Sequence, residues 1–170
     1  GNKMIKVRKY EPADFKSVTI LLAEFHVVMG MLKGRDSKPD YKSAKEGLEE
    51  RIEQGNVILV AEYDQRIVGV EVIAVDPYLK LDFIYVNENY RRKGIAEKLF
   101  DEAEKLLLKN NDEKLFVSVH PNNMAIIGML KKRGYDELNL LELRKRSDDR
   151  NYKEIEIVGS IYQYETDTSM

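Results

Sequence analysis

The residues best suited to chemistry lie between Val86 and Ala96, where a basic loop joins an apolar run to an amphipathic helix pattern. Arg91, Arg92 and Lys93 supply positive charge, and Gly94 lets a ligand approach the backbone closely. The first N–H groups of a helix have no partner within the helix, and the helix dipole makes this end positive. The stretch therefore predicts a binding site for an anion such as a phosphate.

Two other side chains are candidates for moving protons. Asp82 lies inside the apolar run before the loop, where burial of a carboxylate is costly and needs a reason. The alternative is that Asp82 pairs with a neighbouring Lys or faces solvent. His120 ends the next apolar run, and its intrinsic pKa of about 6.5 suits a base at neutral pH, although a merely hydrogen-bonded histidine is the alternative. Glu62 and Glu71 are weaker candidates, which we expect on exposed strand faces.

Hydrophobic periodicity and turn residues predict the elements that would position these groups. We expect helices over residues 12–32, 41–54, 92–110 and 123–133. We expect strands over residues 4–10, 57–63, 67–75, 79–86, 115–119, 138–146 and 152–164. The order βααβββαβαββ indicates an α/β (α+β) protein with a mixed sheet and helices on both faces.

Length and composition exclude several classes of protein. With 170 residues the chain is expected to form one domain, and its net charge of −2 lacks the basic excess of a general nucleic-acid binder. The absence of cysteine excludes disulfides, zinc thiolate sites and a cysteinyl acyl-enzyme. His26 and His120 are too few and too far apart in sequence to suggest a metal cluster, so no metal is expected.

The chain is also expected to be a cytoplasmic protein with no membrane partner, because no apolar run approaches the length of a membrane span and no signal peptide opens it. Residues 1–3 are interpreted as a possible tag remnant and residues 165–170 as a flexible tail. The apolar and aromatic residues 155–164 could pair with a second subunit, which makes a homodimer possible.

Two motifs carry a family resemblance. The pattern Arg91-x-x-Gly94-x-Ala96, after a strand that ends in Val86, resembles the acyl-coenzyme A motif of the GNAT N-acyltransferase superfamily. Asn123, followed by a helix pattern that ends in Lys-Lys-Arg-Gly-Tyr at residues 131–135, resembles the family's second motif. The resemblance covers residues 79–135. It implies a single acyl-CoA N-acyltransferase domain over residues 1–170, with a GNAT-like, mostly antiparallel mixed sheet.

The chemistry implied by the resemblance is direct transfer of acetyl from acetyl-CoA to a primary amine of a small molecule or of a protein. The pyrophosphate is expected on the loop and helix start, and the pantetheine arm is expected to pair with the backbone of the preceding strand. Asn123 is expected to bond the pantetheine arm as well as to cap its helix. The implied cofactor-binding residues are Ile84, Tyr85, Val86, Arg91, Arg92, Lys93, Gly94, Ile95, Ala96 and Asn123.

The sequence departs from the family pattern at Leu130, where the family usually has a Tyr credited with protonating the leaving thiolate. Either the thiolate leaves unassisted, or Tyr85 or Tyr135 serves, or the protein is a noncatalytic acyl-CoA binding module that acts on a protein partner. Asp82 lies where several family members carry a Glu credited with deprotonation. Gly128, inside the last predicted helix, suggests close approach by another group such as the cofactor.

Overall fold

The computed structural model describes residues 4–109 and 114–167, and these residues form two compact units. The first unit is made of Gly1–His26 and Pro39–Ser118, and the second of Val27–Lys38 and Val119–Met170. The expectation of one functional domain over the whole chain stays a prediction. Residues 1–3 and 168–170, part of the expected tag and tail, lie outside the described residues.

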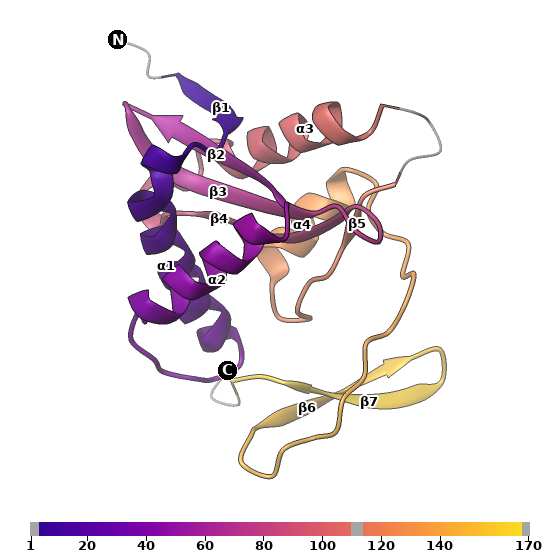
Figure 1. The fold of residues 1–170 in the computed structure, drawn as a ribbon. Coiled ribbons are helices and arrows are strands. Elements are labelled where there is room, and N and C mark those ends of the chain that lie inside the picture. Colours follow the sequence, from indigo (N-terminus) through magenta and orange to yellow (C-terminus); the bar gives the residue numbers. More distant parts are fainter. Residues whose placement is uncertain (1–3, 110–113, 168–170) are drawn as a thin grey trace. The chain divides into compact units, whose positions relative to one another are not determined.

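The first unit is built on a five-stranded sheet with the order β1-β2-β3-β4-β5 (Figure 1). Its first four strands pair antiparallel along the chain, and only β4 and β5 run parallel. This confirms the α/β class with a mostly antiparallel mixed sheet. The strands are β1 (Ile5–Lys9), β2 (Val57–Tyr63), β3 (Arg66–Ala74), β4 (Lys80–Val86) and β5 (Phe116–Val117).

Helices cover both faces of this sheet, as expected from the element order (Figure 1). A short 3-10 turn, Pro12–Asp14, leads into α1 (Phe15–Leu32), and α2 (Tyr41–Glu53) and α3 (Ile95–Leu107) follow. Phe25 of α1 stacks on Phe83 of β4 with ring centroids 4.6 Å apart. On the opposite face, α3 packs over Gly69 of β3, whose strand partner is Val86. Phe83 and Val86 point to opposite faces because strand side chains alternate.

Helix α1 and its leading turn are long and apolar enough, by length and composition, to cross a membrane. By this criterion the expectation that no apolar run approaches a membrane span is wrong. Core helices meet the same criterion, and Val18, Leu22 and Ala23 of α1 are fully buried. The length and apolar composition of α1 are therefore explained equally well by a core helix and by a membrane-spanning helix.

The second unit contains α4 (Met124–Lys132) and a hairpin of β6 (Tyr152–Ile157) and β7 (Ser160–Glu165). Two strands do follow α4, but they are not the two expected. The strand predicted over residues 138–146 is wrong, since this segment has no regular structure and its leucines are exposed. The single strand predicted over residues 152–164 is instead two, joined by Val158 and Gly159, which both have positive φ angles. The hairpin closes on itself and needs no pairing with the earlier segment.

The end of the described chain is also more ordered than expected. Glu165 is the last residue of β7, and Glu165 and Thr166 are buried. The expected flexible tail therefore does not begin at Glu165. The homodimer suggested for this strand stays a prediction.

Packing of α3 on the sheet depends on the missing side chain of Gly69. A Cβ at this position would lie 3.3 Å from Ile95 Cγ2 and from Leu99 Cδ1, and 3.4 Å from Ala61 Cβ. We expect Gly69→Val to lower the free energy of unfolding by about 1–3 kcal/mol, because the helix must move away to admit the side chain. Chemical denaturation measures the change. The control Arg66→Val, exposed on the same strand, should stay within about 0.5 kcal/mol of wild type, and an equally stable Gly69→Val variant would contradict this packing.

Candidate active site

Strand β4 is paired very differently along its two edges. It pairs with β3 from Lys80 to Val86, but with β5 only through Lys80 opposite Phe116 and Leu81 opposite Val117. Within the part of the chain that the structure describes, β4 therefore extends past the end of its parallel partner. An extended ligand could add to such an edge through backbone hydrogen bonds. The side chains of Ile84, Tyr85 and Val86, predicted to bind the pantetheine arm, are buried, so the backbone is what this edge offers.

The loop after β4 leads directly to the start of α3. The chain makes a short 3-10 turn at Glu88–Tyr90, and then Arg92 and Gly94 adopt positive φ angles of 63° and 79°. The helix starts at Ile95, three residues later than predicted, with Gly94 as its N-cap. The positive φ at Gly94 explains the delay, because helical φ angles are negative.

The helix start offers the predicted anion site. The N–H of Lys98 donates to the carbonyl of Gly94 (3.0 Å), so the N–H groups of Ile95, Ala96 and Glu97 have no partner within the helix. A Cβ added to Gly94, the residue before these groups, would meet nothing within 4 Å, so the N-cap position itself is open. The geometry thus fits a phosphate held mainly by the backbone.

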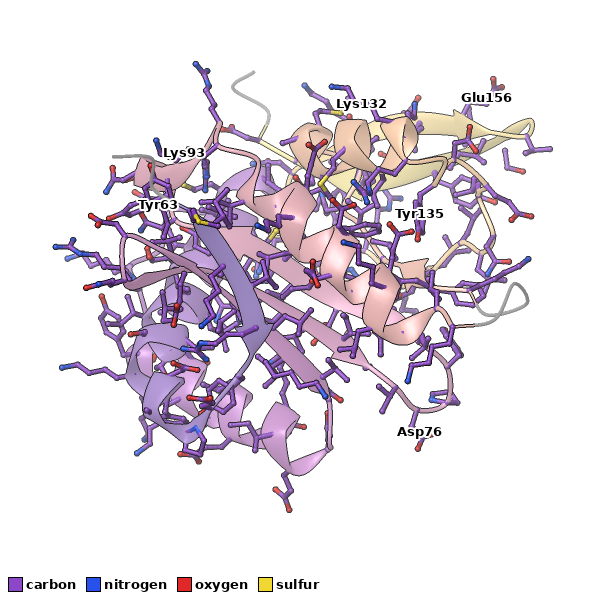
Figure 2. The ribbon with its side chains drawn as sticks, turned by 90° about the horizontal axis from the view of Figure 1, so that it is seen from above. Tyr63, Asp76, Lys93, Lys132, Tyr135 and Glu156 are labelled. Atoms are coloured by element: carbon purple, nitrogen blue, oxygen red, sulfur yellow. The ribbon has the colours of Figure 1, made fainter. Side chains whose placement is uncertain are left out.

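Two of the three basic side chains of the loop lie against protein groups. Arg91 Nε donates to the carbonyl of Val86 (3.2 Å), and its guanidinium lies 5.7 Å from the centre of the Tyr85 ring. Lys93 Nζ lies 5.2 Å from the centre of the Tyr63 ring, at the end of β2 (Figure 2). These contacts hold positive charge beside the helix start. The Arg91 hydrogen bond also uses the carbonyl of Val86, a residue that is predicted to bind the pantetheine arm.

Asp82 occupies an irregular position on β4. The register with β3 passes from Phe83 opposite Val72 to Leu81 opposite Ile73, so Asp82 is the extra residue of a bulge. Its Oδ2 accepts from Arg51 Nε of α2 at 2.8 Å, and its side chain remains 40% exposed. The cation that pairs with Asp82 is therefore Arg51 of helix α2 rather than a neighbouring lysine. A role of Asp82 as the base stays a prediction.

The two weaker carboxylate candidates are not on exposed faces, so that expectation is wrong. Glu71 of β3 lies opposite Ile84 and has 0% exposure. Glu62 is partly buried and accepts from Arg8 Nε at 2.9 Å. Glu71 is buried because β3 is a central strand covered by helices on both faces (Figure 1), and Glu62 on β2 is partly shielded by Arg8 of the neighbouring β1.

His120 and Asn123 lie in the second unit. His120 Nδ1 accepts from the N–H of Asn122 (3.1 Å). Burial, with a smaller effect of Lys33, lowers the pKa of His120 below 6.5, so the ring is neutral at pH 7. Asn123 is the N-cap of α4, but its side chain makes no capping bond.

Three other positions of the second unit bear on the departure from the family pattern. Leu130 is buried, with 5% exposure, and Tyr135 is partly buried. A Cβ at Gly128 would meet nothing within 4 Å, so no described protein group needs the glycine there. The expected close approach to Gly128 is therefore not made by the described part of the chain itself.

Several residues beside the candidate site were not found from the sequence. Arg51 pairs with Asp82, and Glu24 of α1 accepts from Asn87 Nδ2 at 2.6 Å. Burial, followed by the charge of Glu24, raises the pKa of Tyr85 above 10, so this phenol keeps its proton at neutral pH. Glu24 interrupts the apolar surface of α1 and could have been singled out, but Arg51 sits in a highly charged helix and carries no comparable signal.

Two further observations concern ligand sites in general. Among residues 4–109 and 114–167, no group of three or more His, Asp or Glu side chains could hold a metal ion. A hollow of about 260 Å³ lies elsewhere on the first unit and shares no residue with the loop before α3. It is lined by Lys9, Tyr10, Ile52, Asn56, Val57 and Ile58.

The site predicts a specific loss on substitution of Gly94. We expect Gly94→Ala to weaken acetyl-CoA binding at least about tenfold, because it strains the backbone and fills the space before the helix start. Gly55→Ala is the matched control: Gly55 follows α2, has a φ of 74°, and also has open space where a Cβ would lie. Both variants should lose about 1 kcal/mol of stability, but only Gly94→Ala should lose binding. Equal affinity in the two variants, measured by calorimetry, would contradict the assignment.

Comparison with known proteins agrees with this geometry. Residues 21–135 match the acetyltransferase (GNAT) family. An acetyltransferase of Pectobacterium atrosepticum is 32% identical over 99 residues, which are 57% of this chain and 70% of the relative. The family match includes β4, the loop and α3, where the candidate site lies.

Solved structures share the fold. An aminoglycoside N-acetyltransferase in complex with CoA has a TM-score of 0.66 and 14% identity, with coverage of 86% of this chain and 98% of that chain. The ribosomal-protein-alanine N-acetyltransferase of Brucella melitensis has a TM-score of 0.60 and 22% identity, with coverage of 76% and 83%. The family match, the relative and the shared fold together show that this chain belongs to the GNAT family of acetyltransferases.

Proposed function

We propose that this acetyltransferase moves an acetyl group directly from acetyl-CoA to a primary amine of a small molecule or a protein. The proposal rests on one observation: the open edge of β4 and the start of α3 follow each other along the chain. The edge of β4 that extends beyond β5 is followed by a loop and a helix start with unpaired N–H groups, where the N-cap Gly94 has open space at its Cβ position. One feature suits an extended arm and the other suits the phosphates of the same molecule.

Acetyl-CoA, when bound, supplies an acetyl group activated as a thioester. The backbone of Ile84 and Tyr85 would hold the pantetheine arm, and the loop from Arg91 to Ala96 would hold the pyrophosphate. The Asn123 side chain, which makes no cap bond, would be available to the pantetheine arm. Val86 would contribute less through its carbonyl, because Arg91 already donates to it.

The acceptor amine must lose a proton before it attacks. An alkyl amine has a pKa of about 10.4, so it is almost fully protonated at neutral pH. Asp82 is supported as the base by its partial exposure on the bulge of β4 and by Arg51, which orients its carboxylate. His120 is supported by its neutral state at pH 7, but its Nδ1 already accepts a hydrogen bond from the N–H of Asn122.

The acceptor is left open between two classes. One structural neighbour is named for an aminoglycoside and another for the alanine of a ribosomal protein, so this fold serves both small and protein acceptors. The alternative function is a noncatalytic acyl-CoA binding module, which is favoured by the Leu at position 130.

The first experiment is calorimetric titration with acetyl-CoA and with its dephospho and desulfo analogues. Saturable binding of acetyl-CoA supports the site, and absence of binding contradicts the proposal. The dephospho analogue lacks the 3′-phosphate but keeps the pyrophosphate, so it should keep the binding that the loop before α3 provides. Release of free thiol with a panel of amines then separates the two functions. An enzyme releases thiol only when an acceptor is present, whereas a binding module binds acetyl-CoA without releasing thiol with any amine.

The identity of the base is tested by the pH dependence of turnover. If Asp82 is the base, Asp82→Asn should lower kcat by about 100-fold or more, while His120→Ala keeps the basic rise of the profile. If His120 is the base, the rise should lie below pH 6.5, because burial lowers its pKa, and His120→Ala should abolish the rise. Glu49→Gln, on the exposed part of α2, is a charge control that should change neither kcat nor the pH profile. An unchanged rate in both variants would exclude both residues as the base.

A further inference from the structure

The second unit holds a group of basic side chains around one buried carboxylate. Glu165, at the end of β7, has a side chain that is only 1% exposed. Arg35 Nη2 donates to both of its oxygens, at 2.7 and 2.9 Å, and Arg35 Nε donates to Oε1 at 3.1 Å. This single guanidinium already satisfies both oxygens, as a bidentate pair does.

Further cations converge on the same carboxylate. Arg144 Nη2 lies 3.1 Å from Glu165 Oε2, and Arg150 Nε lies 3.4 Å from Oε1. Lys33 is close enough for Arg35, Arg144 and Arg150 to lower its pKa, although burial is the larger cause. These residues come from the loop after α1 and from the segment between α4 and β6. We call Lys33, Arg35, Arg144 and Arg150 the Glu165 cation cluster.

Positive charge exceeds negative charge within this cluster. Apart from Glu165, Arg150 has Asp149 at 3.9 Å, and the Asp149 side chain is 76% exposed. Asp167 also lies near, since its Cα would be 3.0 Å from a Cβ on Gly34, between Lys33 and Arg35. Among the described residues the four cations thus lie near three carboxylates, and one of these, Asp149, is largely in water. Neighbouring like charges repel, and the repulsion is stronger where burial reduces screening. A pair between Glu165 and Arg35 would anchor the hairpin without the other three cations.

The surplus charge is accessible from solvent. The Arg144 side chain donates to Glu165 through Nη2 and is still 71% exposed, so much of its guanidinium is in contact with solvent. Arg35 and Arg150 are 38% and 37% exposed. Guanidinium groups held in place by a buried carboxylate are already ordered, and this lowers the entropy lost when they bind an oxyanion.

We propose that the Glu165 cation cluster is a binding site for a carboxylate or phosphate group, distinct in its residues from the loop before α3. Arg144 and Arg150 bind the oxyanion, and Glu165 with Arg35 holds them in position. The oxyanion is a free small anion, which would offset the charge that the nearby carboxylates leave unbalanced.

The test is saturable binding of inorganic phosphate at constant ionic strength, followed by calorimetry and thermal unfolding. We expect wild type to bind phosphate and Arg144→Gln to bind at least about tenfold more weakly, since a hydrogen bond between charged groups is lost. Lys145→Gln is the matched control, because it removes the same charge from the next, exposed residue. Arg144→Gln keeps the bidentate pair of Arg35 with Glu165, so it should fold, which circular dichroism checks.

Equal phosphate affinity in wild type and Arg144→Gln, or a stabilisation that never saturates, overturns the proposal. The phosphate titration needs no turnover, so failure of the proposed acetyl transfer leaves it intact.

Discussion

Strand β4 is held along one edge by β3 and leaves β5 after two residue pairs, and the candidate site depends on this difference. Pairing with β3 fixes the direction of the strand and the position at which it ends. The unequal pairing with β5 exposes backbone groups that a fully paired central strand would use internally. The same chain direction then brings the loop and α3 to the end of that edge, so a long ligand could be bound at both ends by one continuous segment.

The loop before α3 is ordered by its own basic residues. Arg91 is tied to the Val86 carbonyl and Lys93 lies over Tyr63, while Arg92 and Gly94 accept positive φ angles. A loop held in this way loses little entropy when a phosphate binds. Because the contacts offered are mainly N–H groups, most side chains around them are free to differ. This is consistent with a shared fold at 14% and 22% identity among the solved structures compared above.

Local sequence patterns predicted the helices and strands that carry the site, but they could not predict contacts between residues far apart in the sequence. The limits of β2 at Val57 and Tyr63 could be read from the continuous apolar run and from the polar turn that follows. The ion pair of Arg51 with Asp82 joins residues far apart in sequence, and neither residue signals the other. Residues 138–146 contain four leucines that suggested an apolar strand, but the segment has no β-branched or aromatic residue, and strand formation needs a partner. Val158 was missed as a turn residue because β-branched residues rarely adopt positive φ angles.

The Leu at position 130 bears on catalysis less than its departure from the family pattern suggests. Its side chain is buried, and its carbonyl accepts from the N–H groups of Arg133 and Tyr135, which close the end of α4. A thiol has a pKa of about 8.5, whereas the attacking amine has a pKa of about 10.4. At neutral pH the amine therefore needs deprotonation more than the leaving thiolate needs a proton. The absence of an acid at position 130 therefore leaves unmet only the smaller of the two requirements. Tyr85, a phenol on β4 that keeps its proton at neutral pH, is another group that could protonate the thiolate. The balance of these requirements supports acetyl transfer over binding alone.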